Sequence, residues 1–184
     1  EKAAPLAEAI RVEQRLSYEA HSTDYQAKKA LTQLVEKHFF FLKVGPELTY
    51  RFREAVWALA EIEELLLPSQ TSRVPETVLE TMADEPNNWK SYYHGSEREI
   101  EILKRFSYSD RIRYYWTIPK VQSALKAMIE SLNQQDLPET MISQAFTGLD
   151  FGTIPKDPQM LIEMHIQRCI ARYFEAAGFS KAQG

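Results

Sequence analysis

Two short apolar runs and two amphipathic stretches alternate in the first third of the chain. The run LSYEA ends at a polar segment that begins with His21, and a strand is expected over residues 16–21. Apolar residues then recur at steps of three and four, which predicts a helix over about 26–38. The run FFFLKVG, residues 39–45, has no alternation of apolar and polar positions. Such a run is typical of a strand that is buried on both faces of a parallel sheet.

A second amphipathic helix is expected after this strand. Gly45 and Pro46 end the strand, and a helical stripe of apolar residues continues to Pro68. A strand, helix, strand, helix order places the two strands parallel, and the loops after both strands then open at one edge of the sheet. We therefore expect His21 and Gly45 to lie at a shared edge.

The rest of the chain has no strong strand pattern after Pro68. Helices are expected at about 76–83, 97–105 and 120–133. Two more are expected, one within the stretch LPETMISQAF and one from Pro158 to a stop at Gly178. The acidic run EIEE is expected to be a solvated helix face.

Polar residues before two of the expected helices are candidates for helix caps. Thr23 or Asp24 is expected to cap the first helix of the strand-helix pattern, and Asp157 is expected to cap the last helix of the chain.

The strand-helix pattern is too short to form a sheet on its own, because two strands bury little surface. Eight such units close into a TIM barrel of roughly 250 residues, whose active site lies at the edge where the loops after the strands open. The chain starts at Glu1, inside an expected helix and without an initiator methionine, so we expect a fragment that lacks about six strands.

Composition narrows the classes of function. A formal net charge of -4 and a pI of about 5.7 give no basic footprint for nucleic acid or an anionic membrane surface. Every apolar run is much shorter than the roughly 20 residues of a membrane helix. The single cysteine, Cys169, forms no internal disulfide and implies no thiol chemistry. We expect a cytoplasmic protein that binds neither nucleic acid nor membrane.

Five segments, in order, resemble the C-terminal part of the Z-subunit family (GatZ/KbaZ) of class II D-tagatose-bisphosphate aldolase. They are YEAHSTDYQ, FLKVGPELTYRFREAVWALAEIEE, WKSYYHG, FSYSDRIRYYW and ISQAF. The resemblance runs from about Leu16 to the last helix, and the tail TGLDFGTIPKDPQ departs from it. It implies an α/β fold in which residues 1–67 form the last two strand-helix units of a TIM barrel and residues 68–184 form a mainly helical C-terminal region.

The resemblance also implies a function. The chain is expected to belong to a non-catalytic accessory subunit that supports a separate catalytic aldolase subunit. That enzyme cleaves D-tagatose bisphosphate to two triose phosphates in galactitol or N-acetylgalactosamine catabolism. Two other functions remain open: a tagatose-6-phosphate kinase, although the sequence has no GxxxxGK[ST] loop, and a non-enzymatic helical interaction module.

The first expected site residue is His21. By position it resembles the histidine that class II aldolases use as a ligand of a catalytic divalent metal such as zinc. The structural interpretation is a histidine hydrogen-bonded to Glu19 or Asp24. The other ligands would lie outside this chain, so no metal is expected for the fragment alone.

A phosphate site is expected beside it, at Ser22, Thr23, Lys43, Gly45 and Thr49. The resemblance implies that loops after the last two barrel strands hold a sugar phosphate with backbone amides and hydroxyl groups. Capping and turn formation need the same residue types, so a structural interpretation is also open.

Residues 108–116 join arginines to aromatic side chains. Arg111, Arg113 and Tyr115 could contact a phosphate or a partner subunit, because arginine and aromatic residues are enriched at interfaces. In the structural interpretation, Asp110 pairs with an arginine while the aromatic residues pack the helical region.

The remaining histidines, His38, His94 and His165, show no metal-ligand spacing.

Overall fold

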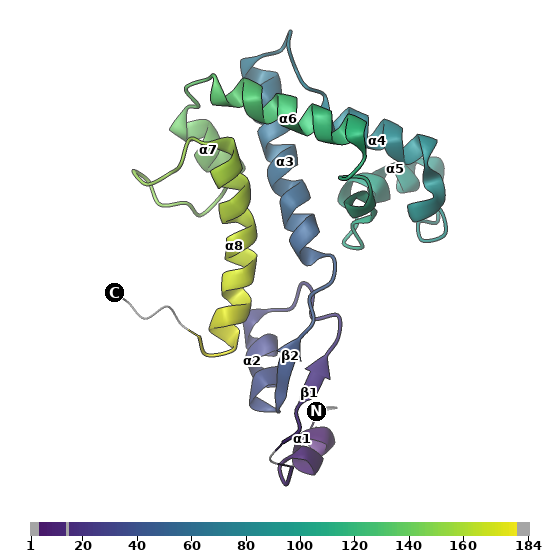
Figure 1. Ribbon diagram of the computed structural model, residues 1–184, viewed down its shortest axis with the longest axis vertical. Helices are drawn as coiled ribbons and strands as arrows, with labels where there is room; N and C mark the ends of the chain where they lie inside the picture. Colours follow the sequence, from purple (N-terminus) through teal and green to yellow (C-terminus); the bar gives the residue numbers. More distant parts are fainter. Residues whose placement is uncertain (1–3, 14, 180–184) are drawn as a thin grey trace. The chain divides into compact units, whose positions relative to one another are not determined.

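The computed structural model describes residues 4–13 and 15–179, which form a mostly helical structure with a small parallel sheet (Figure 1). The elements are α1 (Ala4–Ile10), β1 (Tyr18–Ala20), α2 (Lys28–Glu36), β2 (Phe39–Leu42), α3 (Glu47–Leu66), α4 (Val74–Asp84), the 3-10 turn η1 (Pro86–Asn88), α5 (Glu97–Phe106), the 3-10 turn η2 (Arg111–Tyr114), α6 (Pro119–Asn133), α7 (Glu139–Ala145) and α8 (Pro158–Ala176).

The two strands pair in parallel, as the strand, helix, strand order predicts. Tyr18 lies opposite Phe39 and Ala20 lies opposite Leu42, with an irregularity in the register after Tyr18. Both strands are shorter than the expected ranges. In the described residues the sheet has only these two strands, so the barrel itself is not seen.

The expected burial of β2 on both faces is wrong. Phe40 and Phe41, whose side chains point to opposite faces, are 59% and 60% exposed. A two-stranded sheet with α2 packed against it has too few neighbours to cover both faces. The apolar run therefore indicates that both faces of the strand can be buried, but the described residues do not cover them.

The expected first helix is shorter than its periodic pattern. It begins at Lys28 after an Ala27 N-cap that makes no side-chain bond, so Thr23 and Asp24 lie too far upstream to cap it. That capping prediction is wrong. The helix ends at Glu36, and His38 has a φ of 67°, which is incompatible with a continuing helix.

The chain divides into two compact units. The first unit contains residues up to Leu48 together with residues from Gln167 onward, and the second contains Thr49–Ile166. The expected boundary between residues 67 and 68 is a different division, and it stays a prediction about the longer family fold.

The second unit has a hydrophobic core to which α3 to α8 contribute. Helix α4 packs along α6, and fully buried side chains of both helices contribute to the core. The large residues with no exposed surface in this core are Leu59, Met82, Ile112, Tyr115, Met128, Leu132, Leu137 and Ile142.

Caps and acidic side chains fix the ends of several helices in this unit. Ser96 and Glu99 form a reciprocal capping box at the start of α5. The Met160 amide donates to Asp157 Oδ1, so the predicted cap of α8 is confirmed. The expectation that EIEE is wholly solvated is wrong for Glu63, which is 1% exposed and accepts hydrogen bonds from Ser72 and Ser131.

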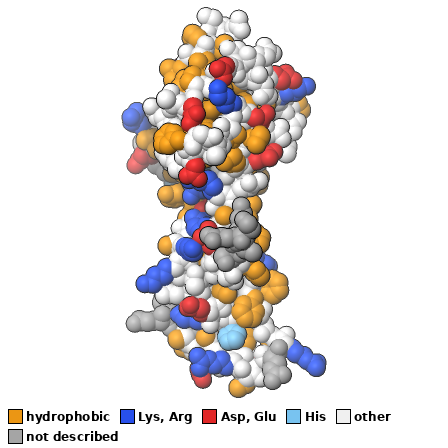
Figure 2. Space-filling view, turned by 90° about the vertical axis from the view of Figure 1, so that its left-hand side faces the viewer, with side chains coloured by type: hydrophobic (Ala, Val, Ile, Leu, Met, Phe, Trp, Pro, Cys, Tyr) orange, Lys and Arg blue, Asp and Glu red, His pale blue; other side chains and the backbone are white. Residues whose placement is uncertain are grey.

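Charged side chains of both signs are interspersed on the face drawn in Figure 2, with exposed hydrophobic side chains between them. No large patch of one sign covers this face. Among the residues that the structure describes, no helix is both long and apolar enough to cross a membrane.

Candidate functional site

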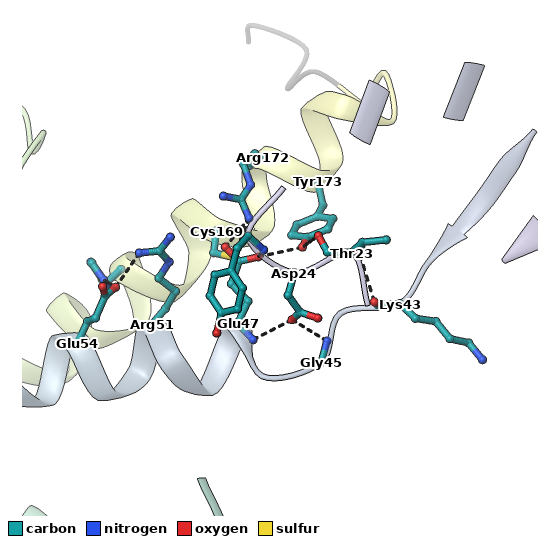
Figure 3. Close-up of polar contacts among 12 residues, drawn as sticks. Thr23, Asp24, Lys43, Gly45, Glu47, Arg51, Glu54, Cys169, Arg172 and Tyr173 are labelled. Carbon is teal, nitrogen blue, oxygen red and sulfur yellow. Dashed lines mark hydrogen bonds and ion pairs between the residues drawn. The ribbon is translucent and has the colours of Figure 1, made fainter. Parts of the chain in front are cut away.

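The loops that follow β1 and β2 meet in the first unit (Figure 3). The backbone amide and the hydroxyl of Thr23 each donate to the Lys43 carbonyl oxygen at 3.2 Å. Asp24 Oδ1 accepts from the Gly45 amide at 2.8 Å and from the Glu47 amide at 2.9 Å. These bonds bring Thr23, Lys43 and Gly45 together, as their places after parallel strands predict.

Asp24 caps α3 rather than α2. The first amides of a helix have no partner within the helix, and the Asp24 carboxylate binds the amide of the first α3 residue, Glu47. Gly45 permits this approach, because a Cβ at this position would lie 3.0 Å from Asp24 Oδ2. The side chain that approaches Gly45 closely is therefore that of Asp24.

Glu47 is a buried carboxylate with no exposed surface. Its Oε2 atom accepts the Tyr25 amide at 2.8 Å and lies 3.0 Å from the Tyr173 hydroxyl, and its Oε1 atom pairs with Arg172. Burial acts to raise the pKa of Glu47, but the hydrogen bonds from Tyr25, Arg172 and Tyr173 outweigh it and hold the pKa below its ordinary value. Glu47 is thus ionised at neutral pH.

Tyr173 joins α8 to the loop after β1 and to the first residue of α3. Its hydroxyl oxygen lies 3.0 Å from the Thr23 carbonyl oxygen and 3.0 Å from Glu47 Oε2, so one proton faces two acceptors. Burial, and to a smaller extent the Glu47 carboxylate, raises the pKa of Tyr173 to about 12. We call Asp24, Glu47, Arg172 and Tyr173 the loop-locking cluster, because together they fix the segments after β1 and β2 (Figure 3).

His21 is exposed beside this cluster. Its Nε2 atom lies 3.2 Å from Glu19 Oε2, and the Lys43 amine contacts the same carboxylate oxygen at 2.8 Å. The Lys43 amine and then the His21 ring lower the pKa of Glu19. In the described residues, no group of three or more His, Cys, Asp or Glu side chains could hold a metal. A metal role for His21 stays a prediction about the longer family fold.

His21, Ser22 and Thr23 line a cavity of about 310 Å³ in the first unit, together with residues of α2. Ser22 has a φ of 54°, so the loop bends sharply beside this cavity. Lys43 and Gly45 are not part of the lining, although their loop contacts Thr23. Thr49 lies in the first turns of α3, in the second unit.

The aromatic-arginine segment, residues 108–116, lies in the second unit. The Arg111 guanidinium lies 3.2 Å from the centroid of the Tyr92 ring, which is a close cation–π contact. Arg113 donates to the Ser109 carbonyl oxygen and to the Tyr114 hydroxyl, both at 2.9 Å. Tyr92 and Tyr114 are 56% and 42% exposed, so this part of the segment presents aromatic side chains on the surface of the unit.

The remainder of the segment has a structural role. Asp110 pairs with Arg53 of α3, at 2.8 Å between Nε and Oδ1, rather than with an arginine of the segment. Tyr115 has no exposed surface, and its hydroxyl donates to the Glu85 carbonyl oxygen. Tyr115 therefore stabilises the unit and is not placed to contact a partner directly.

Sequence reasoning missed Glu47, Arg172, Tyr173 and Arg53. The cap pattern at Asp24 was the only local signal, and it indicated the wrong helix. The pairs of Arg53 with Asp110, of Glu47 with Arg172 and of Glu47 with Tyr173 each join positions more than 50 apart in the sequence.

Comparison with known protein families matches residues 1–178 to the family of D-tagatose-1,6-bisphosphate aldolase subunits described as GatZ/KbaZ-like. The chain belongs to the GatZ/KbaZ-like family. A crystal structure of a probable tagatose 6 phosphate kinase from Sinorhizobium meliloti 1021 is similar to this chain, with 38% sequence identity and a TM-score of 0.90. The match covers 95% of this chain and 46% of that chain. The GatZ/KbaZ resemblance of the five segments is thus confirmed.

Proposed function

We propose that this chain is the C-terminal part of a non-catalytic accessory subunit of class II D-tagatose-1,6-bisphosphate aldolase. The observation that carries the proposal is the GatZ/KbaZ-like family match over residues 1–178. The accessory subunit supports the activity and stability of a catalytic aldolase subunit in the cytoplasm, in galactitol or N-acetylgalactosamine catabolism.

In this proposal, β1 and β2 are the last two strands of a TIM barrel. Their parallel pairing supports it, because every neighbouring pair of strands in such a barrel is parallel. The exposed Phe40 and Phe41 support it as well, since the interior and the outer helices of a barrel cover both faces of each strand. The chain spans 46% of the similar solved protein, which is long enough to hold the other strands.

The strand-end loops then hold a sugar phosphate at the edge of the barrel. Ser22 and the Lys43 amine are the groups of the first unit that we assign to the phosphate, which would compete with Glu19 for the amine. The expectation for Thr49, which lies in the second unit, stays a prediction about the longer family fold. The Thr23 hydroxyl and the Gly45 amide already donate within the chain, so their role is to fix the loops. A divalent metal, zinc for example, would take His21 as one ligand and the other ligands from the longer fold, and it would polarise the sugar carbonyl.

The partner surface in this proposal is the exposed part of the aromatic-arginine segment, with Arg111 and Arg113 as contact residues. Arginine and tyrosine are enriched at protein interfaces, and here the arginines are held by Tyr92 and Tyr114. Holding a long side chain in place before binding lowers the entropy that association costs. A phosphate contact is the other use open to these two arginines.

Substitutions of Arg113 and of Tyr115 distinguish a role of the segment in partner binding from a role in internal packing. In the full-length parent, meaning the longer protein in which this chain is the C-terminal part, Arg113→Ala is expected to weaken the effect on the catalytic subunit by about 10-fold with an unchanged melting temperature. Tyr115→Ala is expected to lower the melting temperature itself, because truncation leaves a cavity in the core. Both variants are measured by melting and by activation of the catalytic subunit. A fall in melting temperature for Arg113→Ala without a specific loss of activation would show that the segment is not part of the interface.

A second candidate function is phosphoryl transfer to tagatose 6-phosphate. The name of the similar Sinorhizobium meliloti structure favours it. The sequence of this chain contains no GxxxxGK[ST] loop, so this activity would depend on residues of the longer protein. An assay that detects ADP release in the presence of ATP and tagatose 6-phosphate distinguishes this candidate from the first.

A further inference from the structure

The aromatic-arginine segment presents two arginines on a turn that is fixed from below. The side chain of Ile112 in η2 is buried, and so is that of Tyr115, which follows the turn. The Arg111 amide donates to the hydroxyl of Tyr93, another buried side chain, at 3.2 Å. These buried neighbours fix the backbone of the turn, and therefore the places from which the Arg111 and Arg113 side chains extend.

Aromatic rings orient both guanidinium groups. That of Arg111 stacks on the Tyr92 ring and also lies 5.7 Å from the centroid of the Tyr114 ring. That of Arg113 lies 4.8 Å from the same Tyr114 centroid and donates to the Tyr114 hydroxyl. Tyr114 thus joins the two arginines. Because these long side chains are ordered before any partner binds, association costs less side-chain entropy.

Neither arginine is paired with a carboxylate in the part of the chain that the structure describes. Asp110, their neighbour in the sequence, is paired with Arg53 instead. Burial raises the pKa of Asp110, and Arg53 lowers it more than Arg113 does. The hydrogen bond from Arg113, and more weakly the charge of Arg111, lowers the pKa of Tyr114. The surface around Tyr114 is therefore locally positive.

The guanidinium of Arg111 also has unused hydrogen-bonding capacity. None of its side-chain N–H groups donates to an acceptor among the described residues, although its Nε atom is buried. A guanidinium carries several N–H donors in a planar fork that matches the two oxygens of a carboxylate. Charge-assisted bonds of this kind are stronger than bonds between neutral groups. A carboxylate is therefore a favourable partner for this surface.

We propose that Arg111 and Arg113 bind carboxylate groups of an acidic surface segment on the catalytic aldolase subunit, an inference that rests on the accessory function proposed above. Small phosphates bind in concave sites, whereas these arginines lie beside the exposed rings of Tyr92 and Tyr114. The formal net charge of -4 disfavours a long polyanion such as nucleic acid. A short acidic segment on a protein surface complements the local positive charge, and the tyrosine rings cover its contact with the arginines.

Titration calorimetry of the full-length parent with the catalytic subunit tests the proposal. Arg111→Gln and Arg113→Gln are each expected to raise the Kd by about 10-fold or more, because a charge-assisted hydrogen bond is lost. Arg111→Lys keeps the charge without the fork, so its Kd should lie between those of Arg111→Gln and the unaltered parent. These differences should shrink at high salt, since ions screen exposed charges. Lys126→Gln is the matched control, because it removes a positive charge from a side chain of the same unit that is 75% exposed.

Competition experiments identify the chemistry that the arginines recognise. Hexaglutamate is expected to displace the catalytic subunit from the parent, whereas hexaglutamine and inorganic phosphate at the same concentration are not. Displacement by phosphate, or none by hexaglutamate, would show that the arginines do not bind an acidic segment.

The calorimetry also separates this proposal from the accessory function. If the unaltered parent binds the catalytic subunit and both glutamine variants bind it as tightly, the proposal is wrong and the accessory function stands. If the unaltered parent does not bind the subunit at all, the accessory function is wrong, and the proposed partner is wrong with it.

Discussion

Replacing Arg53 with methionine is expected to lower the free energy of unfolding of the second unit by about 3 to 5 kcal/mol. Arg53 and Asp110 form a pair whose side chains are 3% and 0% exposed, and the guanidinium also satisfies the Arg105 carbonyl oxygen. Methionine fills much of the same space but leaves the Asp110 carboxylate buried without its cation. Denaturant unfolding monitored at the tryptophans of this unit measures the effect.

The loss of stability in Arg53→Met should depend on pH in a defined direction. Burial already raises the pKa of Asp110 above its ordinary value of 3.8, and removal of the cation raises it further. The folded variant then prefers protonated Asp110, so its deficit is largest above that raised pKa and shrinks as pH falls through it. Lys120→Met is the control, because its pair with Asp84 is exposed and contributes less than about 1 kcal/mol. A deficit for Arg53→Met as small as that of the control, or one that grows toward acid pH, would contradict this account.

Glu47→Ala is expected to destabilise the first unit by about 3 kcal/mol, at the low end for a buried ion pair because Arg172 is partly exposed. The substitution removes the acceptor of the Tyr25 amide and the anionic partner of Arg172. Hydrogen exchange of the Tyr25 amide reports the change locally. Its exchange is expected to accelerate about 100-fold when local opening becomes easier by about 3 kcal/mol.

The lowered pKa of Glu47 determines how the destabilisation by Glu47→Ala changes with pH. The pKa of Glu47 is lower in the folded state than the ordinary 4.5, so its contribution is complete above pH 4.5 and is lost as pH falls through the folded value. The difference between the unaltered chain and Glu47→Ala should therefore narrow below pH 4.5. Glu36→Ala, an exposed position on α2, should match the unaltered chain. Rapid Tyr25 exchange in that control, or a Glu47→Ala deficit that stays constant into acid, would show that the loop-locking cluster has been misassigned.

Periodic patterns predicted the elements well, because each depends on neighbours in the sequence. The steps of three and four in α2, α3 and α6 follow from one face of a helix packing inward. The parallel pairing of β1 and β2 follows from the helix between them. Asp157 capped the expected helix because its target amide lies only three residues away.

The site could be predicted only in part, because its contacts join distant segments. The places of Thr23, Lys43 and Gly45 after two parallel strands predicted that these residues lie together, as they do. The metal role of His21 and the phosphate roles of Ser22, Thr23, Lys43 and Gly45 stay predictions. The bond between Asp24 and the start of α3 depends on how the two loops meet, and the pair of Glu47 with Arg172 spans 125 residues. No local pattern marks a glutamate as buried when its partner lies so far along the chain.

The effect of the full-length parent on a class II tagatose-bisphosphate aldolase catalytic subunit tests the central claim most directly. The catalytic subunit is assayed for triose phosphate release with increasing parent protein, and its melting temperature is followed in the same mixtures. Since an accessory subunit acts by binding the folded, competent state of its partner, we expect a saturable gain in activity or in melting temperature. An unchanged catalytic subunit at saturating parent protein, or ADP release from ATP and tagatose 6-phosphate by the parent alone, would contradict the accessory-subunit assignment.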